Sequence, residues 1–219
     1  MIPKIIHQIY FDMTGKGIDY FPMFVKSREI CQGYSDYEYI LWDEKKCLKL
    51  ISEDYPEYLS FYNSFRFEIQ KIDFVRFCIL HKYGGFYIDM DMYKLRSLDP
   101  LLSKQFVFHN IRYVQKNYSF IENDFIGSES GSPLWLKVMK DCVSNYREKE
   151  AMSIYDTWKG RFVLQTTGPK FLSRAIKKYI PQYKPMRIAY TKWSKDSEAG
   201  YYIRDHKANT WVNYNKRAS

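Results

Sequence analysis

Apolar and polar residues follow one another along this chain in blocks that predict strands alternating with helices. The β-branched run "IPKIIHQIY" near the start predicts a first strand, and "YEYILW" predicts a second. Strands that alternate with helices predict an α/β fold with a mixed sheet flanked by helices. Helices are expected over Phe21 to Gln32, after the N-cap residue Asp43, over Phe67 to Tyr83, from Pro133 onward and from Pro169 to Tyr179, with strands and loops from Met186.

The run "YGGFYIDMDMYKL" (residues 83–95) has the pattern of a buried strand that carries two acids. Extended backbone sends successive side chains to opposite faces, so Asp89 and Asp91 are expected on one face together with Tyr87. Two carboxylates on one face repel each other unless a positive group lies between them. Oxygen ligands at this spacing suit a hard divalent cation such as Mg²⁺ or Mn²⁺. The alternative is a pair of solvated carboxylates at the end of a strand.

The helix expected before this strand is apolar on all sides. Between Ile72 and Leu80 the only polar side chains are those of Asp73 and Arg76. A helix of this kind is buried, and a buried charge is costly unless it is paired or bound. Residues at i and i+3 are neighbours on a helix, so the two charges can meet in a structural ion pair. The alternative is that both side chains project into a ligand cleft beside Asp89.

The bulk properties limit the class of protein. The chain has 219 residues, a formal net charge of +9 and no repeat or low-complexity linker, so a single domain over residues 1–219 is expected. Residues 151–219 hold 14 Lys and Arg against 4 Asp and Glu, whereas residues 1–150 hold 20 against 21. This basic last third fits a nucleic acid, an anionic membrane surface, a phosphorylated ligand or a merely solvated face. A membrane-crossing run and a signal-peptide pattern are both missing, so a cytoplasmic location is expected.

Several function classes lack their motifs in this sequence. A Walker loop, a GxGxxG fingerprint, an HExxH zinc site and a GxSxG nucleophile elbow are all absent. The sequence carries no signature of a nucleic-acid-binding fold and no Arg/Gly-rich array, so no nucleic-acid partner is expected. The four cysteines are scattered and form no CxxC pair, which predicts reduced core thiols.

The motif that remains is specific enough to suggest a family. The segment "DFVRFCILHKYGGFYIDMDM" resembles the sugar-binding DXD region of glycosyltransferase family 32, which includes yeast initiating α-1,6-mannosyltransferases and bacterial capsule transferases. The family pattern Asp-x-x-Arg, an apolar stretch and Gly-Gly-x-Tyr-x-Asp-x-Asp is met at Asp73, Arg76, Gly84, Gly85, Tyr87, Asp89 and Asp91. The segments "IPKIIHQIY", "YILWD", "NDFIGS", "TTGPKFL" and "DHKANTW" follow in the family's order, so the resemblance spans residues 2 to about 212.

The resemblance implies a fold and a set of site residues. The fold is a single-domain, Rossmann-like GT-A fold with a donor-binding part over about 1–95 and an acceptor-side, basic part over about 96–219. Asp91 and Asp89 would hold the metal, with His206 as a further ligand, although His206 equally fits a surface position between two charged neighbours. The implied catalytic residues are Asp89, Asp91, Asn123 and Asp124. The implied substrate-binding residues are His7, Gln8, Ile9, Asp73, Arg76, Gly85, Tyr87 and Trp211.

The resemblance also implies a reaction. A metal-dependent glycosyltransferase would use Mn²⁺ or Mg²⁺ to move a hexose from a UDP- or GDP-hexose to a glycan, lipid-linked or protein acceptor, with retention at the anomeric carbon. The expected role is polysaccharide biosynthesis, with the basic third meeting the nucleotide diphosphate and, peripherally, an anionic membrane surface. The alternative is a non-catalytic nucleotide-sugar or glycan-binding protein of the same fold. The intact set of Asp73, Arg76, Asp89 and Asp91 argues against that alternative.

Overall fold

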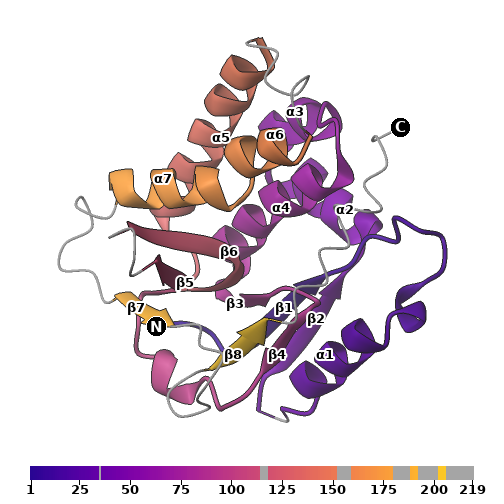
Figure 1. The fold of residues 1–219 in the computed structure, drawn as a ribbon, viewed down its shortest axis with the longest axis vertical. Helices are drawn as coiled ribbons and strands as arrows, with labels where there is room; N and C mark the ends of the chain where they lie inside the picture. The colour runs from indigo at the N-terminus through magenta and orange to yellow at the C-terminus, as the bar shows by residue number, and fades with distance from the viewer. Residues whose placement is uncertain (35, 114–117, 152–158, 180–187, 192–201, 206–219) are drawn as a thin grey trace.

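A six-stranded mixed sheet forms the centre of the fold, with the strand order β2-β1-β3-β6-β5-β7 (Figure 1). The computed structural model describes residues 1–34, 36–113, 118–151, 159–179, 188–191 and 202–205. Strand β1 runs parallel to β2 and β3, β6 runs antiparallel to β3 and β5, and β7 runs parallel to β5. A separate antiparallel ribbon pairs β4 with β8. The strands are β1 (Ile5–Ile9), β2 (Glu38–Trp42), β3 (Gly85–Ile88), β4 (Met92–Lys94), β5 (Phe106–Tyr113), β6 (Tyr118–Ser128), β7 (Ile188–Thr191) and β8 (Ile203–Asp205).

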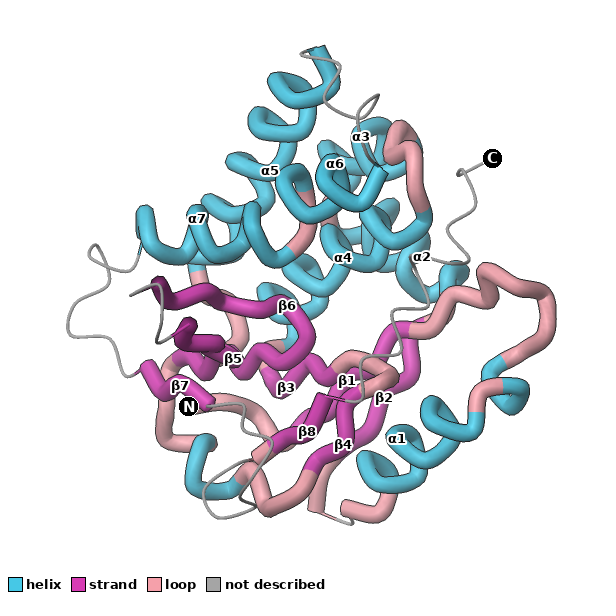
Figure 2. Tube along the Cα trace, in the orientation of Figure 1, coloured by secondary structure: helices cyan, strands magenta, loops and turns pink. Residues whose placement is uncertain are grey.

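Helices lie on both sides of this sheet. Figure 1 shows α4, α5, α6 and α7 gathered on one side, and α1 together with the β4–β8 ribbon on the other. The same arrangement is visible in Figure 2 as a group of helices above the strands. This confirms the expected α/β class with a mixed sheet flanked by helices. The helices are α1 (Pro22–Gln32), α2 (Glu44–Asp54), α3 (Leu59–Asn63), α4 (Glu68–Tyr83), α5 (Pro133–Ala151), α6 (Lys159–Thr166) and α7 (Pro169–Tyr179), with 3-10 turns η1 (Ile18–Tyr20), η2 (Pro56–Tyr58) and η3 (Asp99–Leu101).

Two hydrophobic cores hold these layers together, one on each face of the sheet. The larger core lies between the sheet and α4 to α7, where the rings of Phe77 and Trp135 stack with centroids 5.8 Å apart. The smaller core lies under α1 and includes Phe86 and Ile88. Because side chains alternate along β3, Tyr87 lies in the larger core while its two neighbours lie in the smaller one. The central strand β3 is therefore buried on both faces.

The most strongly patterned helices form where the sequence predicts them. Helix α4 is buried from Gln70 to Leu80, as its apolar pattern requires, and Gly84 ends it in a positive-φ conformation. The side chain of Asp43 caps α2 by accepting the backbone N–H of Lys46 at 2.8 Å. The four cysteines are free and buried, as expected. In the described ranges, no helix combines the length and the apolar character needed to cross a membrane.

The single strand expected over residues 83–95 is wrong. Strand β3 ends at Ile88, a turn occupies the next three residues, and β4 continues in the other sheet. The backbone N–H of Met92 donates to the carbonyl of Asp89 at 3.0 Å and closes this turn. The cause is a distant partner: β4 pairs with β8, from the far end of the chain, and the local pattern contains no information on that pairing.

Gly85 begins β3 at a close approach to β1, and this contact yields a prediction. Its φ is +84°, and a Cβ atom there would lie 2.6 Å from the carbonyl oxygen of Ile5. We expect Gly85→Ala to lower the free energy of unfolding by about 3 kcal/mol, from left-handed strain and overlap together. Urea denaturation of the variant and the parent would measure this difference in the free energy of unfolding. Gly15→Ala is the control, because Gly15 has φ +72° but open space around it and should lose only about 1 kcal/mol. Equal losses of stability in the Gly85 and Gly15 variants would contradict the argument that β1 approaches Gly85 too closely for a Cβ atom.

Candidate active site

The turn between β3 and β4 carries both carboxylates of the DXD motif. The backbone N–H of Asp89 donates to the carbonyl of Asp124 on β6 at 2.8 Å, which fixes the first acid against the neighbouring strand. The hydroxyl of Tyr87 donates to the Asp89 carboxylate. Asp91 is partly exposed at the end of the turn. The motif therefore lies where the sheet ends, with one acid fixed and one reaching solvent.

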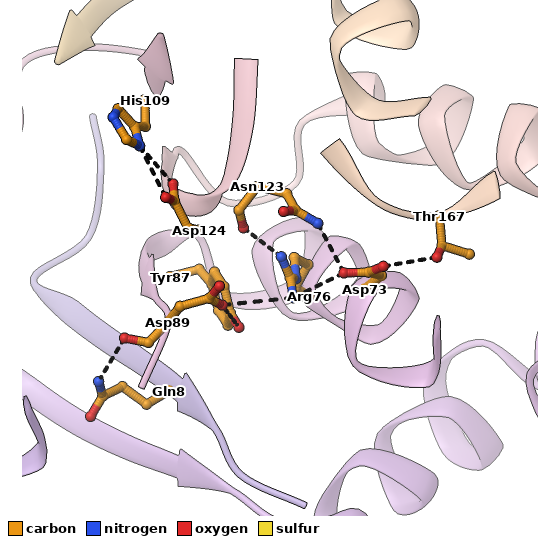
Figure 3. Close-up of polar contacts among 9 residues, drawn as sticks. All are labelled: Gln8, Asp73, Arg76, Tyr87, Asp89, His109, Asn123, Asp124 and Thr167. Carbon is orange, nitrogen blue, oxygen red and sulfur yellow. Dashed lines mark hydrogen bonds and ion pairs between the residues drawn. The ribbon is translucent and has the colours of Figure 1, made fainter. Parts of the chain in front are cut away.

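Arg76 links α4 to this turn. Its guanidinium lies 3.1 Å from the Asp73 carboxylate and 3.7 Å from that of Asp89, and its centre is 4.6 Å from the ring centroid of Tyr87. It also donates to the backbone carbonyl of Asn123 at 2.5 Å. The side chain is only 2% exposed. The sequence left open an ion pair or a cleft position, and the structure shows Arg76 in the ion pair with Asp73 and in contact with Asp89 as well (Figure 3).

Asp73 is surrounded by protein donors on both of its carboxylate oxygens. Asn123 Nδ2 donates to Oδ1 at 2.9 Å, and the hydroxyl of Thr167 donates to Oδ2 at 2.8 Å. Burial raises the pKa of Asp73, while Arg76 and the two hydrogen bonds lower it. The pair thus ties α4, β6 and the start of α7 into one buried network. The role of Thr167 was missed from the sequence, where "TTGPKFL" was recognised only as a family landmark.

The acids around the DXD turn lie close enough to repel one another. Burial raises the pKa of Asp89 well above its usual value, and the charges of Asp91 and Asp124 raise it further, against the lowering effect of Arg76 and Tyr87. The Asp89 side chain is 30% exposed. Arg76 is shared between Asp73 and Asp89, and the repulsion among the acids leaves the charge on Asp89 unfavourable. An environment of this kind attracts a cation.

Asp124 meets a histidine that sequence reasoning did not identify. His109 Nδ1 lies 2.8 Å from Oδ1 and 3.1 Å from Oδ2 of Asp124. His109 is 1% exposed and the Asp124 side chain 16%. In the sequence His109 is a single histidine in the apolar strand segment "QFVFHNI", a context in which most histidines are core residues. Only the pairing of β5 with β6 reveals the contact.

The residues expected at the nucleotide end have buried side chains on β1. His7 Nε2 donates to the carbonyl of Gly84 at 2.9 Å, and its Nδ1 accepts the indole N–H of Trp42 at 3.2 Å. Burial lowers the pKa of His7 to about 4, so this imidazole is neutral at pH 7. Gln8 donates to Ser27 at 2.9 Å, and at 3.5 Å its amide reaches the carbonyl of Asp89. Ile9 is buried in the larger core. These side chains support the strand end and the Gly-Gly turn.

A divalent cation fits the donor set of the turn. Asp89 and Asp91 supply oxygen ligands, and Mg²⁺ and Mn²⁺ are commonly held by one or two carboxylates together with substrate phosphates. A complete cluster of three or more His, Cys, Asp or Glu ligands does not occur among the described residues. His206 and Trp211, the two remaining predicted site residues, lie outside the described residues.

The Asp89 cluster gives a stability prediction with a pH dependence. The folded-state pKa of Asp89 lies above its unfolded value of about 4, so the folded state loses stability as the pH rises through the raised pKa. Asp89→Asn removes that loss. We expect the variant, in EDTA, to be more stable than the parent at pH 8 by about 1 kcal/mol, with a smaller difference at pH 5. Thermal denaturation of both proteins at pH 8 and at pH 5 measures this difference in stability. A variant less stable at both would contradict the electrostatic account.

The Thr167 contact gives a second prediction. Thr167→Val leaves Oδ2 of buried Asp73 without its donor, so we expect the free energy of unfolding to fall by about 2 kcal/mol. Thr167→Ser keeps the hydroxyl and should retain most of the stability. Urea denaturation of the two variants distinguishes a hydrogen bond from simple packing. Equal losses in Ser and Val variants would show that the methyl group, and not the hydroxyl, is what matters.

Comparison with known proteins finds a matching family profile and relatives that align with most of this chain. The profile of the "glycosyltransferase sugar-binding region containing DXD motif" matches residues 26–108. Inositol phosphoceramide mannosyltransferase 3 of Schizosaccharomyces pombe is 33% identical over 209 residues, which cover 92% of this chain and 49% of that protein. Mannosyl phosphorylinositol ceramide synthase CSH1 of Saccharomyces cerevisiae is 34% identical over 202 residues, which cover 91% and 46%. The chain thus spans about half the length of these curated relatives.

Solved structures share the fold. The PaToxG glycosyltransferase superposes with a TM-score of 0.58 at 18% identity, over 84% of this chain and 72% of that one. The UDP-bound glycosyltransferase domain of the YGT toxin gives a TM-score of 0.51 at 10% identity, over 86% and 79%. These similarities concern the fold alone, which is of the GT-A type. With its DXD turn, its fold and its mannosyltransferase relatives, the chain carries a DXD-containing glycosyltransferase region and is similar to glycosyltransferase family 32.

Proposed function

We propose that this protein is a divalent-cation-dependent glycosyltransferase that moves a hexose from a nucleotide-sugar donor to a hydroxyl acceptor. One observation carries the proposal: both carboxylates of the DXD motif lie on one turn at the end of β3, where Arg76 contacts Asp89 and the charges of Asp91 and Asp124 act on Asp89. A group of carboxylates at a motif of this kind is suited to a cation that brings in a diphosphate.

The cation would be held by Asp91, with Asp89 as a second ligand directly or through water. Bound there, it would supply positive charge to the diphosphate leaving group. Mn²⁺ and Mg²⁺ both fit oxygen ligands of this kind. His206 stays a predicted further ligand.

The residues of this chain would bind and orient the donor. Tyr87 and Arg76 fix the Asp89 carboxylate, and Asn123 and Asp73 fix each other beside it. Because these groups are already held by protein partners, they are preorganised and lose little freedom when a sugar binds. The donor hexose would meet this network through Asp89 and the edge formed by Arg76 and Asn123. Trp211 stays a predicted closing residue, and the end of β1 a predicted contact for the base and ribose.

The transfer itself exchanges one bond for another. The bond between sugar C1 and the diphosphate oxygen breaks with its electron pair on the diphosphate, and a bond from C1 to the acceptor oxygen forms. The acceptor's hydroxyl proton passes to the leaving diphosphate. Retention at C1 rests on the family resemblance, and we adopt it as part of the proposal.

The names of the relatives favour a particular donor and acceptor. They are mannosyltransferases of inositol phosphoceramide, so we propose a nucleotide-activated mannose as the donor and a lipid bearing an inositol phosphate as the acceptor, in preference to a polysaccharide. Such a lipid lies at a membrane surface. Helix α7 exposes Lys170, Arg174 and Lys177 on one side, which would favour peripheral contact with an anionic bilayer.

The order of strands in the sheet supports a donor-binding part and an acceptor-binding part of the chain. The donor would bind at the ends of β1 and β3, within about residues 1–95, and the acceptor would approach from β6 and β5, within about 96–219. A single domain containing both parts is the arrangement we propose. The competing function is a nucleotide-sugar or glycan-binding protein without turnover.

A thermal-shift and turnover experiment tests the proposal. GDP-mannose, GDP, UDP-glucose and UDP would each be tested with Mn²⁺, with Mg²⁺ and with EDTA, because a ligand that binds only the folded protein raises its melting temperature. We expect a shift with GDP-mannose that disappears in EDTA, together with slow metal-dependent hydrolysis and transfer to inositol phosphoceramide. Metal-dependent binding without hydrolysis or transfer would favour the binding protein instead.

Substitution of the metal ligand gives the matching prediction. Asp91→Ala should abolish the metal-dependent shift and lower turnover by about 100-fold or more, because the diphosphate loses the charge that stabilises it. The fold should persist, since Asp91 lies at a partly exposed turn. Glu57→Ala, on exposed η2, is the control and should behave like the parent. Parental turnover in the Asp91 variant would refute the metal assignment.

A further inference from the structure

The pairing of β5 with β6 is interrupted at the active site. Phe108 pairs with Ile126, but the next pair along β5 is Asn110 with Ile121, so residues 122–125 of β6 lie opposite His109 alone. Irregularities of this kind interrupt the ladder with one neighbouring strand and redirect side chains. The segment that carries Asn123 and Asp124 is unpaired with β5 here, while on its other side the Asp124 carbonyl still accepts the backbone N–H of Asp89.

The two redirected side chains point to different parts of the structure. Asn123 turns toward α4, where it donates to Asp73 and its carbonyl accepts from Arg76. Asp124 turns toward β5, where His109 Nδ1–H donates to its carboxylate at 2.8 and 3.1 Å. Figure 3 shows the His109–Asp124 pair apart from the group around Asp73. The segment is therefore held from two sides by different partners.

The order of the strands places these groups along a line. Gln8 is on β1, Asp89 directly follows β3, Asp124 is on β6 and His109 is on β5, and these strands are successive neighbours in the sheet. In Figure 3 Asp89 lies between Gln8 and Asp124. If the nucleotide occupies the β1 side and the diphosphate the DXD turn, Asp124 lies beyond the diphosphate, on the side from which an acceptor approaches.

We propose that Asp124 orients the acceptor hydroxyl and that His109 is the positioning residue that holds Asp124 for this task. The inference rests on the proposed function, since it names the residues that serve the acceptor in that reaction. The Asp124 carboxylate accepts the hydrogen bond of the acceptor hydroxyl and directs its oxygen toward sugar C1. The bond changes and the route of the proton are those of the transfer given above.

The charge of the site explains why a partner for Asp124 is needed. The charges of Asp89 and Asp124 repel each other, and Arg76, which also attracts Asp124, is in direct contact with Asp73 and Asp89 instead. A carboxylate in that position would turn away toward solvent unless a donor fixed it. The ring of His109 supplies that donor from a buried position, where it has little freedom to move. The imidazole thus fixes both the direction and the place of the carboxylate.

Two reactions of the same protein separate this role from a structural one. Transfer to inositol phosphoceramide in mixed micelles needs an oriented acceptor, whereas hydrolysis of GDP-mannose uses water and needs only the donor side. We expect His109→Leu and Asp124→Asn each to lower transfer by about 30-fold, because a misplaced reacting group costs one to two orders of magnitude. In the His109→Leu variant, hydrolysis and the thermal shift with GDP-mannose and Mn²⁺ should stay within about threefold and about 1 °C of the parent.

A conservative variant and a double variant complete the design. Asparagine can place its amide N–H near the position of histidine Nδ1, so His109→Asn should recover most of the transfer that His109→Leu loses. The variant carrying both His109→Leu and Asp124→Asn should be no slower than the Asp124 variant alone, because the two residues act as one unit. Losses that multiply in the double variant would overturn the proposal.

The control is another histidine with a similar contact. His81 Nδ1 lies 2.7 Å from the hydroxyl of Tyr55 at the far end of α4, away from the carboxylates, so His81→Leu should leave both reactions at the parental rate. Parallel loss of hydrolysis and transfer in the His109 variants would also overturn the proposal, by assigning the pair to the donor side or to the fold. A parent protein that neither hydrolyses nor transfers would instead refute the proposed function itself. Hydrolysis needs no lipid, so this measurement tests the donor side of the site whatever the natural acceptor is.

Discussion

A buried ion pair on α4 connects the DXD turn to β6 and to the segment before α7. Arg76 and Asp73 lie one turn apart on a helix with an apolar environment, where each would be costly without the other. Asn123 from β6 and Thr167 before α7 form hydrogen bonds with this pair, and the Asp89 carboxylate lies 3.7 Å from Arg76. Helix, central strand, bulged strand and last helix therefore meet at one pair of charges. The position of Asp89 depends on this pair, because Arg76 contacts both Asp73 and the Asp89 carboxylate.

The acids that would bind a charged ligand lower the stability of the protein without that ligand. The acids at the turn repel one another in the absence of a ligand, and burial makes the charge on Asp89 unfavourable. The surrounding scaffold offsets this with two cores and with the close contact between β1 and the Gly-Gly turn. Such local destabilisation is common where a protein must bind a charged ligand, since the ligand's charge relieves it.

The sequence predicted the parts of the fold that local pattern determines. The apolar pattern predicts helix α4, and single residues with known preferences predict its end at Gly84 and the Asp43 cap of α2. The Asp73–Arg76 pair was one of the two arrangements that the spacing allowed, and the motif identified Asp89 and Asp91 but placed them in a strand and not in a turn. His109 and Thr167 could not be found in this way, because their contacts join residues far apart in the chain. The end of β3 at Ile88 was missed for the same reason, since it depends on β8 as a partner for β4.

That last pairing has a consequence for how the protein is made. Strand β4 begins directly after the DXD turn, and its partner β8 is translated much later, near residue 203. Contacts so distant in sequence form late, after local helices and neighbouring strands. A nascent chain can therefore assemble most of the six-stranded sheet while the acidic turn is still held from one side only. The strand on the far side of the turn therefore gains its partner only once residues 203–205 have left the ribosome.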